Sequence, residues 1–127
     1  MSSPTRADPS EKRFRIKGSD IRRLVPSMGG CLATDMIVVE GRLVGYMYRE
    51  APDNDLDSGW RFFAGIETPE YFEDLSHTAV YDVNTVVNYD PSVIPYLEAP
   101  IGSAFERLPD GAAFERAPMP SGSEENV

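Results

Sequence analysis

The sequence has few of the residues that usually carry chemistry. Its 127 residues include one cysteine, Cys31, and one histidine, His77. A single cysteine forms no internal disulfide, which is typical of the reducing cytosol, and one residue of each kind is too few for the usual zinc sites. No glycine-rich phosphate-binding pattern is present. We therefore expect neither a metal site nor a cofactor.

Long hydrophobic runs are also missing. The longest uncharged apolar run near the middle of the chain spans residues 36–39, whereas a membrane-crossing helix needs about 20 such residues. The first 13 residues contain charges but no apolar stretch, unlike a secretory signal. These features favour a cytoplasmic protein without membrane association.

Positive charge is scarce outside the first 25 residues. The chain has 12 Lys and Arg against 21 Asp and Glu, a net charge of −9, and residues 26–127 alone carry a net −13. Such an acidic body repels phosphate backbones, because nucleic-acid affinity depends on Lys and Arg. The same field accelerates association with a basic protein surface. The charge therefore excludes a nucleic-acid partner and favours a protein partner, with a surface that merely keeps the protein soluble as the alternative.

The strand and turn patterns predict one α+β domain over residues 13–117, an antiparallel meander with short helices packed on one side. We expect the polar flanking segments, 1–12 and 118–127, to be disordered. Alternating or β-branched apolar residues predict strands within four segments, 14–16, 31–39, 43–50 and 60–64.

The second half of the chain predicts helices and a hairpin. Thr68 and Pro69 are typical of a helix start, so we expect one short helix over residues 69–75 and a similar one over 91–97. The β-branched run 80–87 fits either a strand or a buried helix. The two copies of Ala-Phe-Glu-Arg around Pro109, Asp110 and Gly111 predict a closing hairpin.

The segment with Asp53, Asp55 and Asp57 resembles a calcium loop, since carboxylates at alternate positions can surround that ion. However, Ser58 stands where such a loop needs glycine, and Ala64 stands where it needs a bidentate glutamate. We therefore interpret the segment as an acidic hairpin loop. Repulsion among its carboxylates would keep it open and suited to receive Lys or Arg side chains of a partner.

A catalytic interpretation has little support. Cys31 and His77 would form a nucleophile and base, with Asp82 orienting the imidazole, but Cys31 lies in an apolar run and no family signature accompanies the pair. We assign no catalytic residue. A small-molecule or metal-responsive domain, or an uncharacterised cysteine hydrolase, remains the alternative.

The strand around Trp60 holds the most aromatic stretch of the chain. We expect Phe62 or Phe63 to pack in the core, and Trp60, at the edge of the acidic loop, to be an interface anchor, because tryptophan is enriched at binding hot spots. Arg49 and Arg61 are the only cations of this acidic region, and we expect them to pair with neighbouring carboxylates.

Six blocks in order along the chain resemble a bacterial family, the immunity-protein-33-like domain. They are GCLATD at 30–35, GYMYRE at 45–50, DSGWRFFAG at 57–65, YDVNTV at 81–86, NYDP at 88–91 and PIGSAFER at 100–107. The resemblance covers about residues 28–110. It departs at Ile66, where the family often has an acidic residue.

The resemblance implies a small cytoplasmic protein that neutralises a toxin and has no catalytic residues. An inhibitor of this kind works by binding, and an acidic one suits a basic toxin. We expect its contact face to be the acidic hairpin with the helix that follows it, comprising Glu50, Asp53, Asp55, Asp57, Trp60, Glu67, Glu70 and Tyr71.

Overall fold

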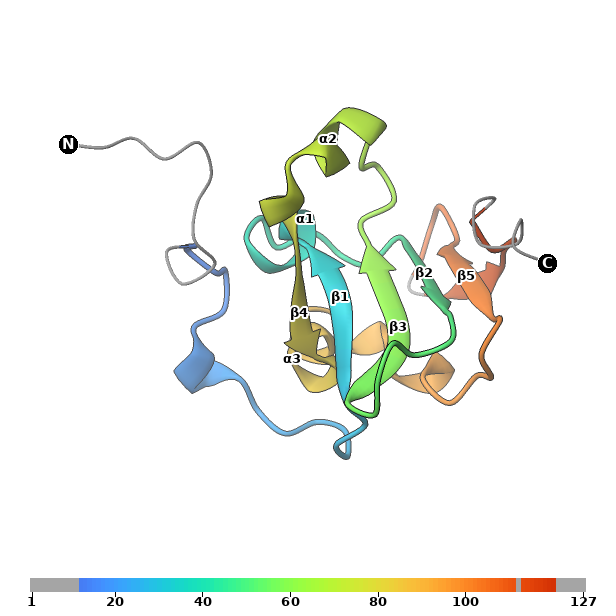
Figure 1. The fold of residues 1–127 in the computed structure, drawn as a ribbon, viewed down its shortest axis with the longest axis horizontal. Helices are drawn as coiled ribbons and strands as arrows, with labels where there is room; N and C mark the ends of the chain where they lie inside the picture. The colour runs from blue at the N-terminus through green and yellow to red at the C-terminus, as the bar shows by residue number, and fades with distance from the viewer. Residues whose placement is uncertain (1–11, 112, 121–127) are drawn as a thin grey trace.

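A six-stranded sheet forms the centre of the protein in the computed structural model, which describes residues 12–111 and 113–120 (Figure 1). The strands are β1 (Gly30–Thr34), β2 (Tyr46–Arg49), β3 (Asp57–Phe63), β4 (Thr78–Asp82), β5 (Ala104–Arg107) and β6 (Phe114–Arg116). Their order across the sheet is β4-β1-β3-β2-β5-β6. β1 and β3 are parallel, and the other neighbouring pairs are antiparallel. The predicted α+β class is confirmed.

The predicted meander is wrong at the parallel pair. Parallel neighbours need a crossover, and the chain between β1 and β3 passes through a short helix, α1 (Asp35–Val38), and then β2. The strand expected over residues 36–39 is this helix, which buries Ile37 and Val38. The strand expected at 14–16 does not form either, although the Arg15 amide donates one hydrogen bond to the Val38 carbonyl, at 2.8 Å.

Local capping explains the remaining helices. α2 (Pro69–Glu73) begins as predicted, because Thr68 Oγ1 accepts a hydrogen bond from the Tyr71 amide at 3.1 Å. It ends earlier than predicted, and a 3₁₀ turn, η3 (Leu75–His77), follows. Residues 80–87 divide between strand and helix at Asp82, whose side chain accepts from the Asn84 amide at 2.8 Å and so starts α3 (Val83–Tyr89).

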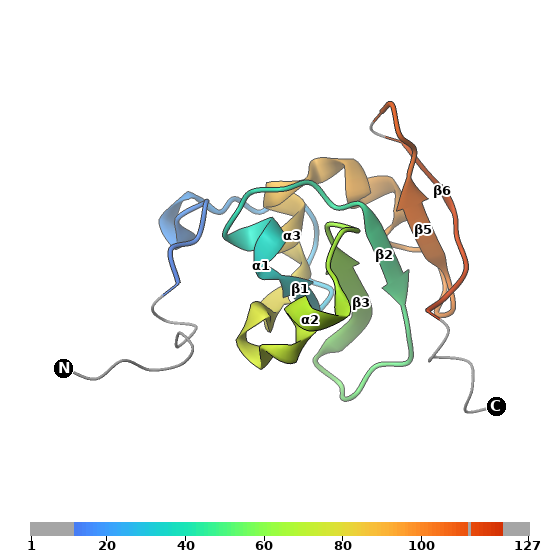
Figure 2. The same ribbon diagram turned by 90° about the horizontal axis from the view of Figure 1, so that it is seen from above.

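One face of the sheet is covered and forms the core. α3 and the 3₁₀ helix η4 (Pro91–Tyr96) pack behind the sheet in Figure 1, and Figure 2 shows them on that side from above. Trp60 and Phe62 stack there at 5.8 Å, both fully buried. The core otherwise consists largely of aliphatic side chains, Val25, Ile37, Val38, Val44, Met47, Val83, Val86, Val87, Val93 and Leu97.

The N-terminal part of the described chain runs along the helices. Asn84, only 4% exposed, accepts hydrogen bonds from the Leu24 and Val25 amides and donates one to the Arg22 carbonyl. Lys12, which belongs to the segment expected to be disordered, forms an ion pair with Asp35 at 2.6 Å. Of the C-terminal segment, residues 118–120 are described, and the Pro118 carbonyl accepts a hydrogen bond from the Tyr46 hydroxyl at 2.8 Å. Residues 1–11 and 121–127 lie outside the described residues. No helix in the described part of the chain has the length and apolar character needed to cross a membrane.

Candidate functional site

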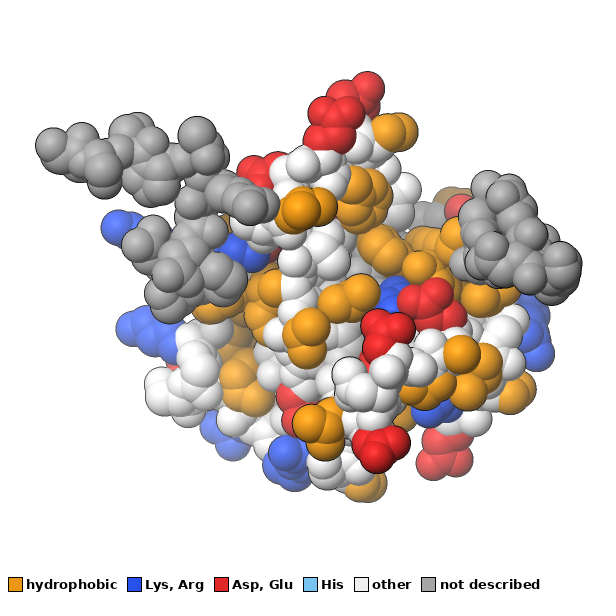
Figure 3. Space-filling model, viewed as in Figure 1, with side chains coloured by type: hydrophobic (Ala, Val, Ile, Leu, Met, Phe, Trp, Pro, Cys, Tyr) orange, Lys and Arg blue, Asp and Glu red, His pale blue; other side chains and the backbone are white. Residues whose placement is uncertain are grey.

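In the described part of the chain, α3 and η4 leave the second face of the sheet uncovered, and this face is the candidate binding surface (Figure 1). Residues paired across strands place their side chains on the same face, so Leu32, Val80 and Arg61 share this face with Tyr48. In the next row Tyr46 lies between Phe63 and Glu106. We call this surface the open face, and Figure 3 views it directly.

An ionic cluster around Arg61 occupies the middle of the open face. The Arg61 side chain is 2% exposed, and its Nε donates to Glu50 Oε2 at 2.7 Å. Its two terminal nitrogens donate to the two carboxylate oxygens of Asp57, at 2.9 and 2.8 Å. Asp53 Oδ2 lies 4.0 Å from the same guanidinium, with its own side chain 83% exposed. The predicted pairing with nearby acids is therefore confirmed for Arg61, whereas Arg49 donates to the Ser58 and Ala99 carbonyls instead.

Asp57 closes the loop between β2 and β3. Besides Arg61, its carboxylate accepts from the backbone amides of Asp53 and Gly59, each at 2.9 Å. The hydrogen bonds from Arg61 hold the pKa of this carboxyl well below its usual range, and they raise the pKa of Arg61 in turn. The expectation of a loop opened by repulsion is thus wrong for Asp57, because Arg61 neutralises it.

Gly59 makes this geometry possible. Its φ is +90°, and a Cβ atom there would lie 2.3 Å from the Glu50 carbonyl oxygen. β3 passes from Asp57 to Arg61 where its neighbour β1 passes only from Gly30 to Leu32, so the strand bulges at this point. The extra residues keep Asp57 and Arg61 on the same face and bring their side chains within hydrogen-bonding distance.

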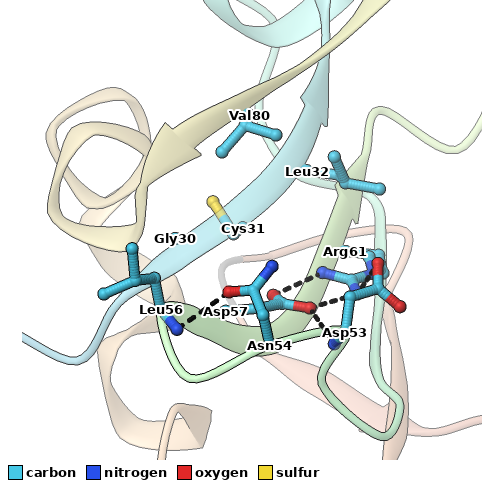
Figure 4. A pocket seen from close by; sticks show the side chains of 9 residues that line it. All are labelled: Gly30, Cys31, Leu32, Asp53, Asn54, Leu56, Asp57, Arg61 and Val80. Carbon is cyan, nitrogen blue, oxygen red and sulfur yellow. Dashed lines mark hydrogen bonds and ion pairs between the residues drawn. The ribbon is translucent and has the colours of Figure 1, made fainter.

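A small cavity of about 260 Å³ lies between this cluster and β4. Figure 4 shows Asp53, Asp57 and Arg61 at one side of it and the apolar side chains of Leu56 and Val80 at the other. Leu56 and Val80 are 80% and 71% exposed. Large exposed apolar side chains beside a charged cluster are typical of protein-binding surfaces.

A larger groove of about 930 Å³ lies on the other side of the cluster. Its aromatic residues are Tyr46, Tyr48, Phe63 and Phe72, with Tyr48 and Phe63 stacked at 5.8 Å and 14°. Burial raises the pKa of Tyr46 and of Tyr48, and the negative charges of Glu106 and Glu50, respectively, contribute to the shifts. We call this hollow the aromatic groove.

The exposed charges of the open face are predominantly acidic. Asp53, Asp55, Glu70, Glu73 and Glu106 are exposed, and within residues 12–111 and 113–120 the last four form no ion pair. Figure 3 shows acidic side chains at the top of this face, at its centre and along its lower edge, while basic side chains lie near the N-terminal segment, below the centre and at the opposite edge.

The structure brings Glu50, Asp53 and Asp57 together but removes Trp60 from the predicted contact face. Trp60 is fully buried on the covered face, and its indole nitrogen donates to the Leu97 carbonyl at 3.1 Å. Its predicted role as an exposed anchor is wrong, because Trp60 alternates with Arg61 along β3 and so points to the covered face together with Phe62.

The remaining predicted residues lie along the strand-to-helix connection after β3. Glu67 accepts from the Ala64 and Gly65 amides and from Thr34 Oγ1, so it fixes this connection. Glu70 is exposed on α2. Tyr71 stacks on His77 at 4.1 Å, and burial raises its pKa to about 12.

The residues of the alternative catalytic interpretation, Cys31, His77 and Asp82, each have a different structural role. Cys31 is 1% exposed, and burial raises the pKa of its thiol, which disfavours the thiolate. His77 Nδ1 lies 2.7 Å from the Tyr71 carbonyl oxygen, and the Asp82 side chain caps α3. In the described part of the chain, no group of three or more His, Cys, Asp or Glu is placed to hold a metal ion.

Sequence comparison assigns the chain to a family. The profile of the Immunity protein Imm33 domain matches residues 31–117, which is more than half of the chain. The chain belongs to the Imm33 immunity protein domain family. The matched region contains β2 to β6 complete and nearly all of β1, and it confirms the resemblance seen in the six sequence blocks. Membership indicates a role in immunity to a toxin, and so a protein partner. No curated protein and no solved structure matches the chain.

The aromatic groove is the part of the Imm33 surface that sequence reasoning missed. Its residues come from five separate segments, including β2, β3, α2 and β5. One signal was present, since Tyr46 and Tyr48 alternate on one face of a strand. Only the strand order shows that Phe63 and Glu106 flank them.

Proposed function

We propose that the protein neutralises a basic toxin by forming a stoichiometric complex through its open face, without catalysing a reaction. The observation that carries the proposal is the distribution of charge on this face. The central cation, Arg61, is buried and neutralised by Glu50 and Asp57, whereas Asp53 and Asp55 point outward from the loop. A partner therefore meets an acidic rim, formed by Asp53 and Asp55. The negative charge of such a rim steers a basic protein surface into place.

The predicted contact residues divide by role under this proposal. Asp53, Asp55 and Glu70 would meet the partner directly, because they are exposed. Glu50, Asp57 and Glu67 would shape the surface through the internal hydrogen bonds they accept. Tyr71 would hold α2 against η3 through its stacking on His77.

A binding titration with charge reversal tests the proposal. The chain would be titrated calorimetrically into toxin domains encoded by its source organism, at low and at high salt. We expect a one-to-one complex with one of them, weakened by salt, and Asp53→Lys with Asp55→Lys should lower the affinity at least about tenfold. Asp20→Lys with Glu98→Lys makes the same charge change at exposed positions elsewhere and should have a much smaller effect.

Equal losses for the two double variants would show that only net charge matters, and the open face would not be the contact surface. If no toxin domain binds the wild-type chain at low salt, the proposed function is wrong.

A further inference from the structure

Two carboxylates lie in an unfavourable arrangement at the edge of the aromatic groove, one of which lines it. Glu106 of β5 is the register partner of Glu115 of β6, so two negative charges lie directly opposite each other beside Tyr46. Like charges at such positions destabilise a sheet. Neither carboxylate forms an ion pair with another described residue.

The nearby cations do not relieve this repulsion. Arg107 donates to the Asp90 carboxylate and to the Val44 carbonyl, and its guanidinium lies over the Phe114 ring at 4.6 Å. Arg116 lies over the Phe105 ring at 5.5 Å, and Phe105 belongs to the core. The acidic end of the groove is therefore left for an external cation.

The floor of the groove is also suited to a cation. Tyr46 lies 6.0 Å from Tyr48 and 6.2 Å from Phe63, ring centroid to centroid, with tilts of 46° and 32°, so the three rings lie together at the floor of the groove. Aromatic faces attract Arg and Lys side chains, more strongly where water is excluded. Glu106 next to Tyr46 adds a charge-assisted hydrogen-bond acceptor at one end.

We propose that the aromatic groove is the docking site for an arginine or lysine side chain of the basic toxin, which stacks on Tyr46 and Tyr48 and pairs with Glu106. This inference rests on the proposed function and specifies the chemistry of the contact. It commits to a charged occupant because the rings and the unpaired Glu106 carboxylate, two separate features of the groove, favour a cation. Most of the binding energy of an interface comes from a few well-packed residues, often arginine and tyrosine. A side chain bound in the groove would provide such a contact, which the exposed carboxylates of the acidic rim do not.

Nuclear magnetic resonance with a small probe tests the groove without the toxin. The full chain, with labelled aromatic rings, would be titrated with N-acetyl-arginine methylamide and, separately, with its uncharged analogue N-acetyl-citrulline methylamide. We expect the ring signals of Tyr46, Tyr48 and Phe63 to shift with the arginine compound, and the citrulline compound to bind about fivefold more weakly. Glu106→Gln should weaken arginine binding, while Glu98→Gln, at an exposed acid outside the groove, should not change it.

Three results would overturn the inference. Equal binding of both probes, or of neither, would mean that the groove does not recognise a cation. Ring signals that change with protein concentration would assign the groove to a second copy of the chain. Nuclear Overhauser contacts from residues 121–127 to the tyrosine rings would assign it to the chain's own C-terminus.

A second measurement separates this inference from the proposed function. In the toxin complex, Tyr48→Leu and Glu106→Gln should each lower the affinity about fivefold, although Glu106→Gln removes the repulsion with Glu115 and should not lower the unfolding midpoint. If the complex forms and depends on salt but its affinity is unchanged by both substitutions, the groove inference fails while the proposed function stands. If no toxin binds, the proposed function fails, and the probe titration alone decides whether the groove binds a cation.

Discussion

Arg61 and Asp57 make a two-point contact, with both terminal nitrogens of the guanidinium within 2.9 Å of the two carboxylate oxygens. The residues are four apart on one strand, a spacing that places side chains far apart in a regular strand. The bulge at Gly59 brings them together, and the contact then fixes the loop that presents Asp53 and Asp55. One local backbone feature thereby shapes the acidic rim of the open face.

Arg61→Met should destabilise the protein strongly. The substitution leaves Glu50 and Asp57 without their cation, and removing one partner of a buried pair costs about 3–5 kcal/mol. The free energy of unfolding, measured by urea denaturation, checks this. Arg42→Met is the matched control, because the Arg42–Glu40 pair has side chains 52% and 45% exposed and should contribute less than about 1 kcal/mol. Equal losses for the two variants would contradict a structural role for the cluster.

Acid should weaken the fold through Asp57. Its pKa is held below the ordinary value of 3.8, so the carboxylate contributes stability above that pH and loses it as the pH falls toward the folded-state pKa. The difference in unfolding free energy between wild type and Asp57→Asn should therefore be largest above about pH 5 and shrink as the pH falls below about 4. Denaturant titrations at several pH values test this, and a difference that stays constant with pH would rule out the proposed linkage.

Trp60→Ala should unfold or severely weaken the domain. The side chain is fully buried and stacked on Phe62, and such truncations cost about 3–5 kcal/mol. Trp60→Phe should cost less, because it keeps most of the ring packing but loses the hydrogen bond to Leu97. Thermal unfolding followed by circular dichroism measures both. A loss below about 1 kcal/mol for Trp60→Ala would return this residue to the candidate contacts.

Asn84→Ala should loosen the segment that precedes the family-matched region. Asn84 satisfies two amides and one carbonyl of residues 22–25, and unsatisfied buried groups cost about 1–3 kcal/mol each. Hydrogen exchange of the Leu24 and Val25 amides should become faster. Asn88→Ala, at a position that also contacts the Arg22 carbonyl but binds neither of these amides, should accelerate them much less. Unchanged exchange in Asn84→Ala would show that the segment is held by other contacts.

Features set by a few neighbouring residues could be predicted from the sequence. The start of α2 at Pro69 follows from the Thr68 cap, and the β5–β6 hairpin follows from the turn residues between its strands. The parallel pairing of β1 with β3 could not be predicted, because strand order depends on contacts between distant segments. α1 was also missed, since four residues are too few for a helical period to show.

The candidate site could be predicted only where its residues lie close together in the sequence. The exposure of Asp53 and Asp55 and the pairing of Arg61 follow from a cluster of charges close in sequence. The prediction for Trp60 relied on its place beside the acidic loop, although strand alternation puts it on the same face as Phe62, which lies in the core. The aromatic groove needs Tyr46 and Glu106 side by side, 60 residues apart in the chain, and the register alone reveals that.

The most direct test of the account is the stoichiometry of inhibition. The activity of the bound toxin would be measured while the chain is added in known molar ratios, and again after high salt separates the two proteins. We expect activity to fall linearly to zero at one chain per toxin and to return in full after separation, because binding alone blocks the toxin. Loss of activity well below an equimolar ratio, or failure to recover after separation, would show that the chain modifies its target and would contradict the binding mechanism.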